Sequence, residues 1–163
     1  MSADRRGAAS VALDRLRERG WTLGIAESLT GGSLASALIA VPGASAIVLG
    51  AVVAYAAPLK HTLLGVDADL LAAHGAVHPE VARQMAEGVR RTVAVDRRWA
   101  DVGIATTGIA GPGSPDGQPV GTVFLGLASP LGSQVVRLDV DGDRDSIRAT
   151  TVQRALSMLA AVG

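Results

Sequence analysis

The stretch Ala26-Glu27-Ser28-Leu29-Thr30-Gly31-Gly32 constrains the fold most strongly. It follows an apolar run at residues 21–25 that is typical of a buried strand, and it precedes residues 33–39, which favour a helix. Backbone N–H groups at the start of such a helix can bind an anion or a carbonyl oxygen, and ligands of α/β sheets collect at the carboxyl ends of strands. The alternative is a capped turn in which Ser28 or Thr30 serves only the helix. The pattern matches neither a Walker nor a GxGxxG motif, so both interpretations stay open.

The hydropathy pattern along the rest of the chain predicts alternating helices and strands. We expect helices over 8–19, 56–65, 67–71, 79–95 and 143–162, and strands over 46–55, 100–106, 120–128 and 134–139. The run 46–55 is apolar and rich in β-branched residues, which indicates an internal strand. The last two strands are close enough to form a hairpin. The sequence therefore predicts an α/β fold, a three-layer α/β/α sandwich on a mixed β-sheet, with residues 1–163 as a single domain.

The composition excludes several classes of partner. The 163 residues include 15 basic and 15 acidic ones, so no net charge attracts nucleic acid or anionic lipid. Only 2% of the residues are aromatic, which leaves little for stacking single-stranded bases. No signal peptide is visible, and no apolar run reaches the roughly 18–20 residues that a membrane span requires. We expect a cytoplasmic protein that binds neither nucleic acid nor membranes.

The possible metal ligands are few. The chain has no cysteine and three histidines, of which His74 and His78 are four residues apart. Gly75 and Pro79 make one continuous helix through both histidines unfavourable. Two ligands do not make a zinc site, so we expect no metal.

Ser45 and Lys60 are the candidates for covalent chemistry. Ser45 lies on a turn before the strand 46–55, and Lys60, the only lysine, follows that strand. A serine nucleophile needs a base, and a lysine serves as one only when it is neutral. Lowering a lysine pKa from about 10.4 to about 7 takes about 4 kcal/mol, normally from burial or a nearby cation. Each residue alone is more often an ordinary turn serine or a surface lysine.

Three further positions can contribute to a site. Tyr55, the only tyrosine, can contact a substrate or be a core ring with its hydroxyl at the rim. The glycine-rich stretch that contains Thr107, Gly108, Ala110 and Gly111 can form an oxyanion hole or a flexible turn. Arg144 and Arg148 share a face at the start of the last helix. There they can bind a phosphate or carboxylate, or pair with Asp141 or Asp145.

Taken together, the motifs resemble one family, the C-terminal domain of the competence/damage-inducible protein CinA, known as nicotinamide-nucleotide amidohydrolases. The resemblance covers nearly the whole chain. It rests on residues 26–32, Pro42-Gly43-Ala44-Ser45, Tyr55 with residues 60–66, residues 74–77, residues 107–112 with 119–123, and Gly142-Asp143-Arg144.

This resemblance implies hydrolysis of nicotinamide mononucleotide to nicotinate mononucleotide and ammonia, without a metal or cofactor. It implies catalytic roles for Ser45 as nucleophile, Lys60 as its base, and Tyr55. It also implies substrate binding by two loops and the last helix, through Glu27, Ser28, Thr30, Gly31, Gly32, Thr107, Gly108, Ala110, Gly111, Arg144 and Arg148. A homodimer is expected from the resemblance and because small enzymes are commonly dimeric.

The sequence departs from the family pattern at three positions. Leu29 stands where the family usually has cysteine, a change we expect to be mild. Ala57 and Pro58 stand where it often has asparagine and an acid, so an acidic residue that orients Lys60 is missing there. Two other functions remain open: a nucleotide-binding module without turnover, and a regulatory or scaffold protein linked to competence or DNA damage.

Overall fold

The computed structural model describes residues 3–114 and 117–163. Its centre is a five-stranded sheet in the order β2-β1-β3-β4-β5. The strands are β1 (Leu23–Glu27), β2 (Val48–Val53), β3 (Val102–Gly108), β4 (Thr122–Ser129) and β5 (Gly132–Asp139). β1 is parallel to β2 and to β3, whereas β4 is antiparallel to β3 and β5. The mixed sheet and the hairpin β4–β5 are therefore confirmed.

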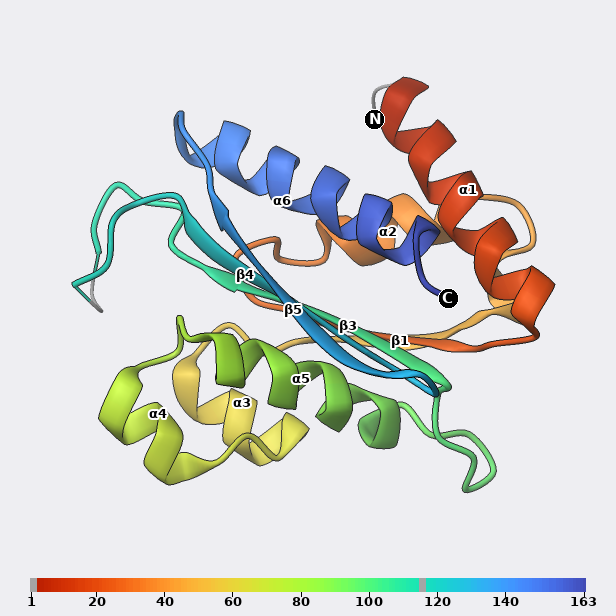
Figure 1. Cartoon of the computed structure of the whole chain (residues 1–163), viewed down its shortest axis with the longest axis horizontal. Helices are drawn as coiled ribbons and strands as arrows, with labels where there is room; N and C mark the ends of the chain where they lie inside the picture. Colours follow the sequence, from red (N-terminus) through yellow and green to blue (C-terminus); the bar gives the residue numbers. More distant parts are fainter. Residues whose placement is uncertain (1–2, 115–116) are drawn as a thin grey trace.

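Helices cover both faces of the sheet (Figure 1). On one face lie α1 (Ala3–Arg19), α2 (Ser33–Ile39) and α6 (Arg144–Ala160), and on the other lie α3 (Ala57–Leu64), α4 (Ala68–His74) and α5 (Pro79–Thr92). A short 3₁₀ helix, η1 (Ala44–Ala46), precedes β2. The three-layer α/β/α sandwich is thus confirmed. Among the described residues, no helix is both long and apolar enough to cross a membrane.

Small residues let α5 lie close to its neighbours. An added Cβ at Gly103 on β3 would lie 1.9 Å from the Ala86 carbonyl oxygen, and one at Gly126 on β4 would lie 2.1 Å from that of Ala82. Within α5 itself, a Cβ at Gly88 would lie 1.8 Å from the Leu64 carbonyl oxygen of α3. These distances are far below van der Waals contact, so only glycine fits.

The ends of the elements follow local chemistry. Asp67 and Asp143 cap α4 and α6 by accepting backbone N–H bonds, and Pro58 and Pro79 occupy first turns, where their missing N–H is not needed. β1 and β3 each continue two residues beyond the predicted ends, to Glu27 and Gly108. The candidate motifs therefore begin on the strands themselves.

The prediction that residues 46–55 form an internal strand is wrong for this chain. β2 is a parallel strand at the edge of the sheet, and its only strand partner among the described residues is β1. Its side chains are intermediate or exposed, with Ala51 and Val53 exposed, whereas β1 is buried throughout. A sequence typical of sheet interiors thus lies at a sheet edge.

Candidate active site

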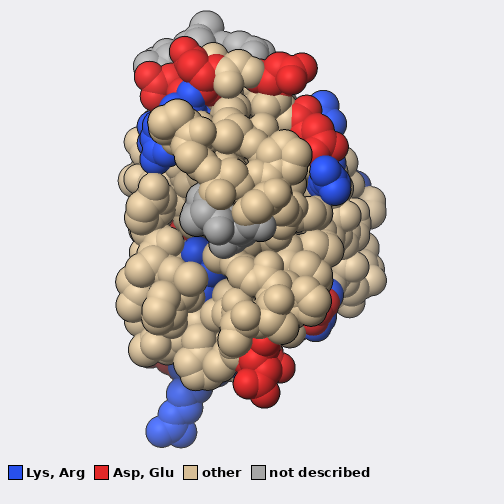
Figure 2. All heavy atoms as spheres, turned by 90° about the vertical axis from the view of Figure 1, so that its left-hand side faces the viewer, with Lys and Arg blue, Asp and Glu red and all other residues tan. Residues whose placement is uncertain are grey.

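A pocket of about 390 Å³ opens where β1, β2 and β3 end. Because these strands are parallel, their carboxyl ends lie at one edge of the sheet, and the loops that follow them meet there. Figure 2 looks onto this side of the molecule, where Lys or Arg atoms are recessed among uncharged residues. The pocket is lined by Ser28, Leu29, Tyr55, Ala57, Lys60, Ala76, Val77, Thr107, Gly108, Ile109, Ala110, Gly111, Gly113 and Arg144.

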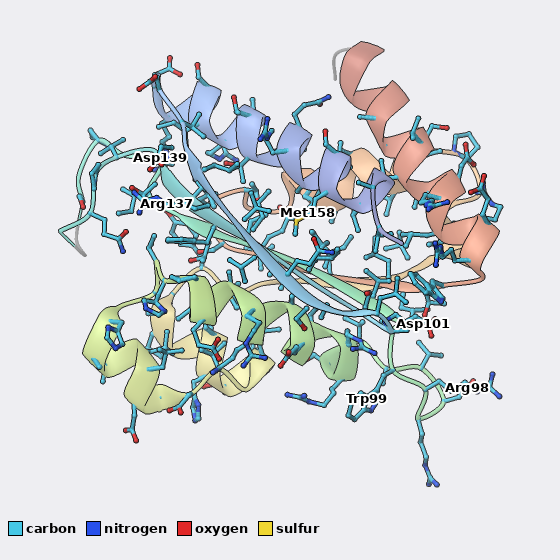
Figure 3. All side chains as sticks on the ribbon, in the orientation of Figure 1. Arg98, Trp99, Asp101, Arg137, Asp139 and Met158 are labelled. Atoms are coloured by element: carbon cyan, nitrogen blue, oxygen red, sulfur yellow. The ribbon has the colours of Figure 1, made fainter. Side chains whose placement is uncertain are left out.

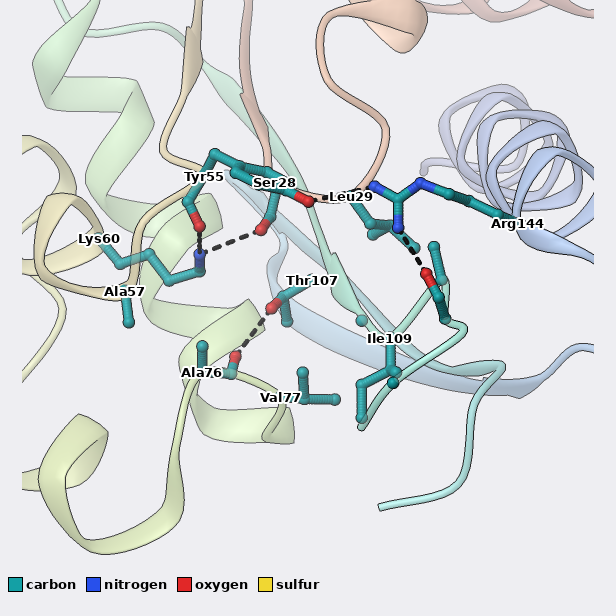
Figure 4. Close-up of a pocket in the computed structure, with 14 residues that line it drawn as sticks. Ser28, Leu29, Tyr55, Ala57, Lys60, Ala76, Val77, Thr107, Ile109 and Arg144 are labelled. Atoms are coloured by element: carbon teal, nitrogen blue, oxygen red, sulfur yellow. Dashed lines mark hydrogen bonds between the residues drawn. The ribbon is translucent and has the colours of Figure 1, made fainter. Parts of the chain in front are cut away.

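Lys60 is the centre of the polar part of the pocket. Its side chain extends from α3 toward β1, and its Nζ donates to the Ser28 Oγ at 3.1 Å (Figure 4). The same Nζ donates to the Ala54 carbonyl oxygen at 2.7 Å. A longer bond of 3.5 Å reaches the Tyr55 carbonyl oxygen. Lys60 is 1% exposed and Ser28 is 7% exposed. Burial disfavours the charged form of an amine, whereas hydrogen bonds from the amine to carbonyl oxygens favour that form.

Ser45 lies elsewhere, which corrects the predicted pairing of Ser45 with Lys60. Ser45 is exposed in η1, before β2, and lines a separate shallow pocket with residues 39–44 and Val48. Lys60 follows the other end of β2. The six residues of that strand span roughly 20 Å at about 3.3 Å per residue. Lys60 bonds instead to Ser28, which the sequence predicted only as a substrate-binding residue.

Glu27 organises the turn that carries Ser28. Its carboxylate is fully buried and accepts N–H bonds from Gly32 at 3.0 Å, Leu34 at 3.1 Å and Ala35 at 2.8 Å. These are the donors at the start of α2 that the sequence assigned to an external anion. An internal carboxylate already occupies these donors, and neither Glu27 nor Gly32 lines the pocket, so the structure does not support the substrate contacts predicted for these two residues.

The remaining residues of this turn are held from two sides. Thr30 is buried, and its hydroxyl lies 2.8 Å from that of Thr106 on β3. Arg148 on α6 donates to the Leu29 carbonyl oxygen at 2.9 Å and to that of Thr30 at 3.3 Å, and it pairs with Asp145 at 3.7 Å. Thr30, Gly31 and Arg148 do not line the pocket. They hold the turn that carries Ser28, so the structure does not support the substrate contacts predicted for them.

The loop after β3 forms the opposite wall, as predicted. Thr107, Gly108, Ala110 and Gly111 all line the pocket. The Thr107 hydroxyl donates to the Ala76 carbonyl oxygen at 2.8 Å, which joins this wall to the segment between α4 and α5. No described residue accepts a hydrogen bond from the backbone N–H of Ala110 or Gly111.

Arg144 and Tyr55 meet at the mouth of the pocket. The Arg144 guanidinium donates to the Tyr55 hydroxyl at 3.1 Å and to the Gly111 carbonyl oxygen at 2.7 Å, as the dashed lines in Figure 4 show. Tyr55 is 61% exposed, so it is not a core residue. The two side chains bridge three segments that are far apart in the sequence, and they place one positive charge at the entrance.

The histidines considered for zinc have other contacts. The rings of His74 and His78 stack with centroids 4.8 Å apart, and the His78 Nδ1 accepts a hydrogen bond from the Glu80 backbone N–H. Within residues 3–114 and 117–163, no group of three or more His, Asp or Glu side chains is arranged to hold a metal ion.

Topology alone would have placed Ser28, rather than Ser45, at the same edge of the sheet as Lys60. Residues that directly follow neighbouring parallel strands lie at the same edge of a sheet, and residues that precede them lie at the other. Ser28 follows β1 and Lys60 follows β2 by a few residues, whereas Ser45 precedes β2. The order of the strands was not needed for this inference, since parallel pairing of the first two strands is sufficient.

Comparison with known proteins agrees with this architecture. The model of the CinA C-terminal domain matches residues 6–162. A CinA-like protein from Anaeromyxobacter sp. (strain K) is 50% identical over 151 residues, which are 91% of this chain and 36% of that protein. A CinA-like protein from Gloeobacter violaceus is 49% identical over 160 residues, 96% of this chain and 36% of that protein. The chain thus spans about a third of the length of these curated relatives.

Solved structures show the same fold. The CinA superfamily protein KP700603 from Klebsiella pneumoniae superimposes with a TM-score of 0.89 at 33% identity, covering 96% of this chain and 95% of that one. A CinA superfamily protein from Escherichia coli superimposes with a TM-score of 0.90 at 32% identity, covering 99% and 93%. The chain belongs to the CinA C-terminal domain family.

Proposed function

We propose that this protein hydrolyses the carboxamide of nicotinamide mononucleotide to nicotinate mononucleotide and ammonia, with Ser28 as nucleophile and Lys60 as its base. The observation that carries the proposal is the buried hydrogen bond of 3.1 Å between the Lys60 Nζ and the Ser28 Oγ. A buried serine and lysine in hydrogen-bond contact, beside a pocket, are the elements of an activated nucleophile. Family membership supports an amidase reaction, and the choice of Ser28 comes from the geometry.

The reaction takes two half-reactions. Neutral Lys60 accepts the Ser28 hydroxyl proton while the Oγ attacks the carboxamide carbon, and the amide oxygen becomes an oxyanion. The lysine then returns a proton to the amide nitrogen, the C–N bond breaks, and ammonia leaves with a nicotinoyl ester on Ser28. Water next gives a proton to Lys60 and attacks the ester carbon. Collapse releases the carboxylic acid and returns the proton to Ser28.

The rest of the pocket suits this substrate. The free N–H groups of Ala110 and Gly111 are available to stabilise the oxyanion. Val77 and Ile109 provide an apolar wall for a flat ring, and Arg144 at the mouth can bind the phosphate. The pyridinium ring withdraws electrons from the carboxamide carbon, which makes that carbon a better target for a serine oxygen. Tyr55 contacts the substrate at the rim in this proposal.

Ammonia release from nicotinamide mononucleotide, followed together with chromatography of the product, tests the proposal. We expect turnover by the unmodified protein and a loss of at least about a thousandfold in Lys60→Ala. Calorimetric titration with the nucleotide is done on both proteins. Binding without ammonia release by the unmodified protein would identify a nucleotide-binding module. No binding at all would favour a regulatory or scaffold role.

A further inference from the structure

The side chain of Thr106, near the end of β3, faces away from the pocket. Successive side chains of a strand lie on opposite faces of a sheet. Ala105 packs with Met85 of α5, and Thr107 lines the pocket on that same face. Ile104 packs on the other face, with residues of α1, α2 and α6. Thr106 follows Ile104 by two residues and so shares its face. It does not line the pocket, and a substrate there has no direct contact with it.

The Thr106 hydroxyl binds the backbone where the pairing of β1 with β3 stops. That pairing ends at Ala26 and Ala105. Just beyond it, the backbone N–H of Ser28 donates to the Thr106 Oγ at 3.4 Å. Ser28 is the first residue after β1, so this contact influences where the chain leaves the strand and where the Ser28 Oγ lies relative to Lys60. A bond of this length is weak. Its loss should therefore change the position of Ser28 more than the stability of the fold.

Thr30 holds the Thr106 hydroxyl in place. The two hydroxyl oxygens are 2.8 Å apart, and both side chains are fully buried. Buried hydroxyls cannot turn toward bulk water, so each of these two depends on the other as a hydrogen-bond partner. Ser28 and Thr30 lie on either side of Leu29. One hydroxyl on β3 therefore contacts both ends of the segment 28–30.

The same two strands are also joined by a side-chain contact at their other end. The backbone N–H and the hydroxyl of Thr22 each donate to the Asp101 carboxylate at 2.8 Å. Asp101 directly precedes β3, so this contact lies at the end of the sheet away from the pocket (Figure 3). Thr22 thus offers a comparison with Thr106, because both hydroxyls join β1 to β3 and only the second contacts Ser28.

We propose that Thr106 is a positioning residue for the hydrolysis. Its hydroxyl, held by Thr30, fixes the backbone of Ser28 so that the Ser28 Oγ stays in contact with the Lys60 Nζ. This inference rests on the proposed function, which makes Ser28 the nucleophile and Lys60 its base. Without the Thr106 hydroxyl, the Ser28 N–H and the Thr30 hydroxyl would both lose a partner in a buried place, and the turn would shift. A displacement of about 1 Å at a reacting group can cost about a hundredfold in rate.

Steady-state kinetics of ammonia release from nicotinamide mononucleotide test this proposal. Thr106→Val replaces the hydroxyl by a methyl group of similar size, and we expect kcat to fall about 10–100-fold while KM stays within about twofold. Thr106→Ser keeps the hydroxyl and should keep kcat within about threefold. Thr22→Val is the matched control. It removes a hydroxyl bond to a carboxylate, so it should lower Tm, but kcat should stay within about twofold.

Thr30→Val tests whether Thr30 acts through Thr106. It removes the partner of the Thr106 hydroxyl and leaves the contact with Ser28, so we expect a smaller fall in kcat, about three- to tenfold. The double variant Thr30→Val/Thr106→Val should be no slower than Thr106→Val alone, because both substitutions break one network. Effects that multiply would overturn the proposal. If Thr106→Val does not fold, Thr30→Val decides, and an unchanged kcat in that variant would overturn the proposal.

A fluorophosphonate probe separates this inference from the proposed function. In its reaction the bond between the Ser28 Oγ and phosphorus forms, the P–F bond breaks, the serine proton passes to Lys60, and fluoride leaves. The label that Ser28→Ala lacks therefore reports the nucleophile without an amide substrate. We expect Thr106→Val to react about 10–100-fold more slowly than Thr106→Ser and the unmodified protein.

The two assays together give a clear decision. If no ammonia is released but labelling of Ser28 depends on the Thr106 hydroxyl, the proposed reaction is wrong and the positioning role stands. Three results would overturn the positioning role: a folded Thr106→Val protein with unchanged kcat and labelling, a folded Thr106→Ser protein as slow as Thr106→Val, or an unmodified protein that neither releases ammonia nor reacts with the probe at Ser28.

Discussion

Replacing Glu27 by glutamine tests whether a buried carboxylate holds the turn that carries Ser28. The carboxylate accepts three backbone N–H bonds at the start of α2, of 3.0, 3.1 and 2.8 Å. In Glu27→Gln, the amide oxygen can keep the two bonds from Gly32 and Leu34, now as neutral bonds. The amide nitrogen then faces the Ala35 N–H, so two donors oppose each other.

The expected loss follows from these contacts. A hydrogen bond to a charged group contributes about 1.5–3 kcal/mol, and a charge near a helix N-terminus contributes up to about 2 kcal/mol when partly buried. Losing one bond and weakening two others should lower the free energy of unfolding by about 3 kcal/mol. At about 2–4 °C per kcal/mol for a chain of this size, Tm should fall by about 6–12 °C.

Urea and thermal unfolding followed by circular dichroism measure both quantities. Glu18→Gln is the control, because Glu18 is a carboxylate on α1 whose side chain is 68% exposed and whose loss should change stability by less than about 0.5 kcal/mol. If Glu27→Gln were equally mild, the carboxylate would not be holding the start of α2, and our account of the turn would be refuted.

Three other substitutions test separate parts of the structure. Gly88→Ala should lower the free energy of unfolding by about 1–3 kcal/mol or more in urea melts, because its Cβ would lie 1.8 Å from the Leu64 carbonyl oxygen. The control is Gly7→Ala, on open helix surface, which should be neutral or stabilising. Equal effects of the two substitutions would contradict the close packing of α5 on α3. The Arg83 hydrogen bond lowers the pKa of Glu80 from 4.5 to about 2, against the opposing effect of desolvation. Ionised Glu80 therefore stabilises the fold above pH 4.5, and this contribution is lost as pH falls toward 2. Glu80→Gln should make the free energy of unfolding depend less on pH in this range, by a small amount because the ion pair is partly exposed. An unchanged pH dependence would contradict the pairing of Glu80 with Arg83. Arg144→Ala should raise KM for the nucleotide about 10–100-fold with little change in kcat, because a phosphate bond to a charged group contributes about 1.5–3 kcal/mol; a kcat loss with constant KM would exclude phosphate binding.

Much of the fold could be predicted from the sequence because its signals are local. Apolar periodicity, capping residues such as Asp143, and prolines at first turns mark the helices without knowledge of their neighbours. The order of strands in a sheet depends on contacts between residues far apart in the sequence. For that reason β2 was predicted inside the sheet, although the structure places it at the edge.

The site was predicted less completely, because motif matching does not consider at which end of its strand each residue lies. Lys60, Tyr55, Arg144 and the loop after β3 were identified and do line one pocket. Ser45 was matched to Lys60 by motif, without asking at which end of β2 each residue lies. The free donors at the start of α2 also suggested an external anion, because a pattern cannot show that Glu27 folds back onto them.

The rates of ammonia release by Ser28→Ala and Ser45→Ala, measured side by side on nicotinamide mononucleotide, test the central claim most directly. Our account predicts that Ser28→Ala loses at least about a thousandfold in kcat, because the nucleophile is gone, and that Ser45→Ala keeps nearly full activity. Both variants should remain folded, since each removes a single hydroxyl. An active Ser28→Ala protein, or an inactive and folded Ser45→Ala protein, would contradict the assignment of Ser28 as the nucleophile.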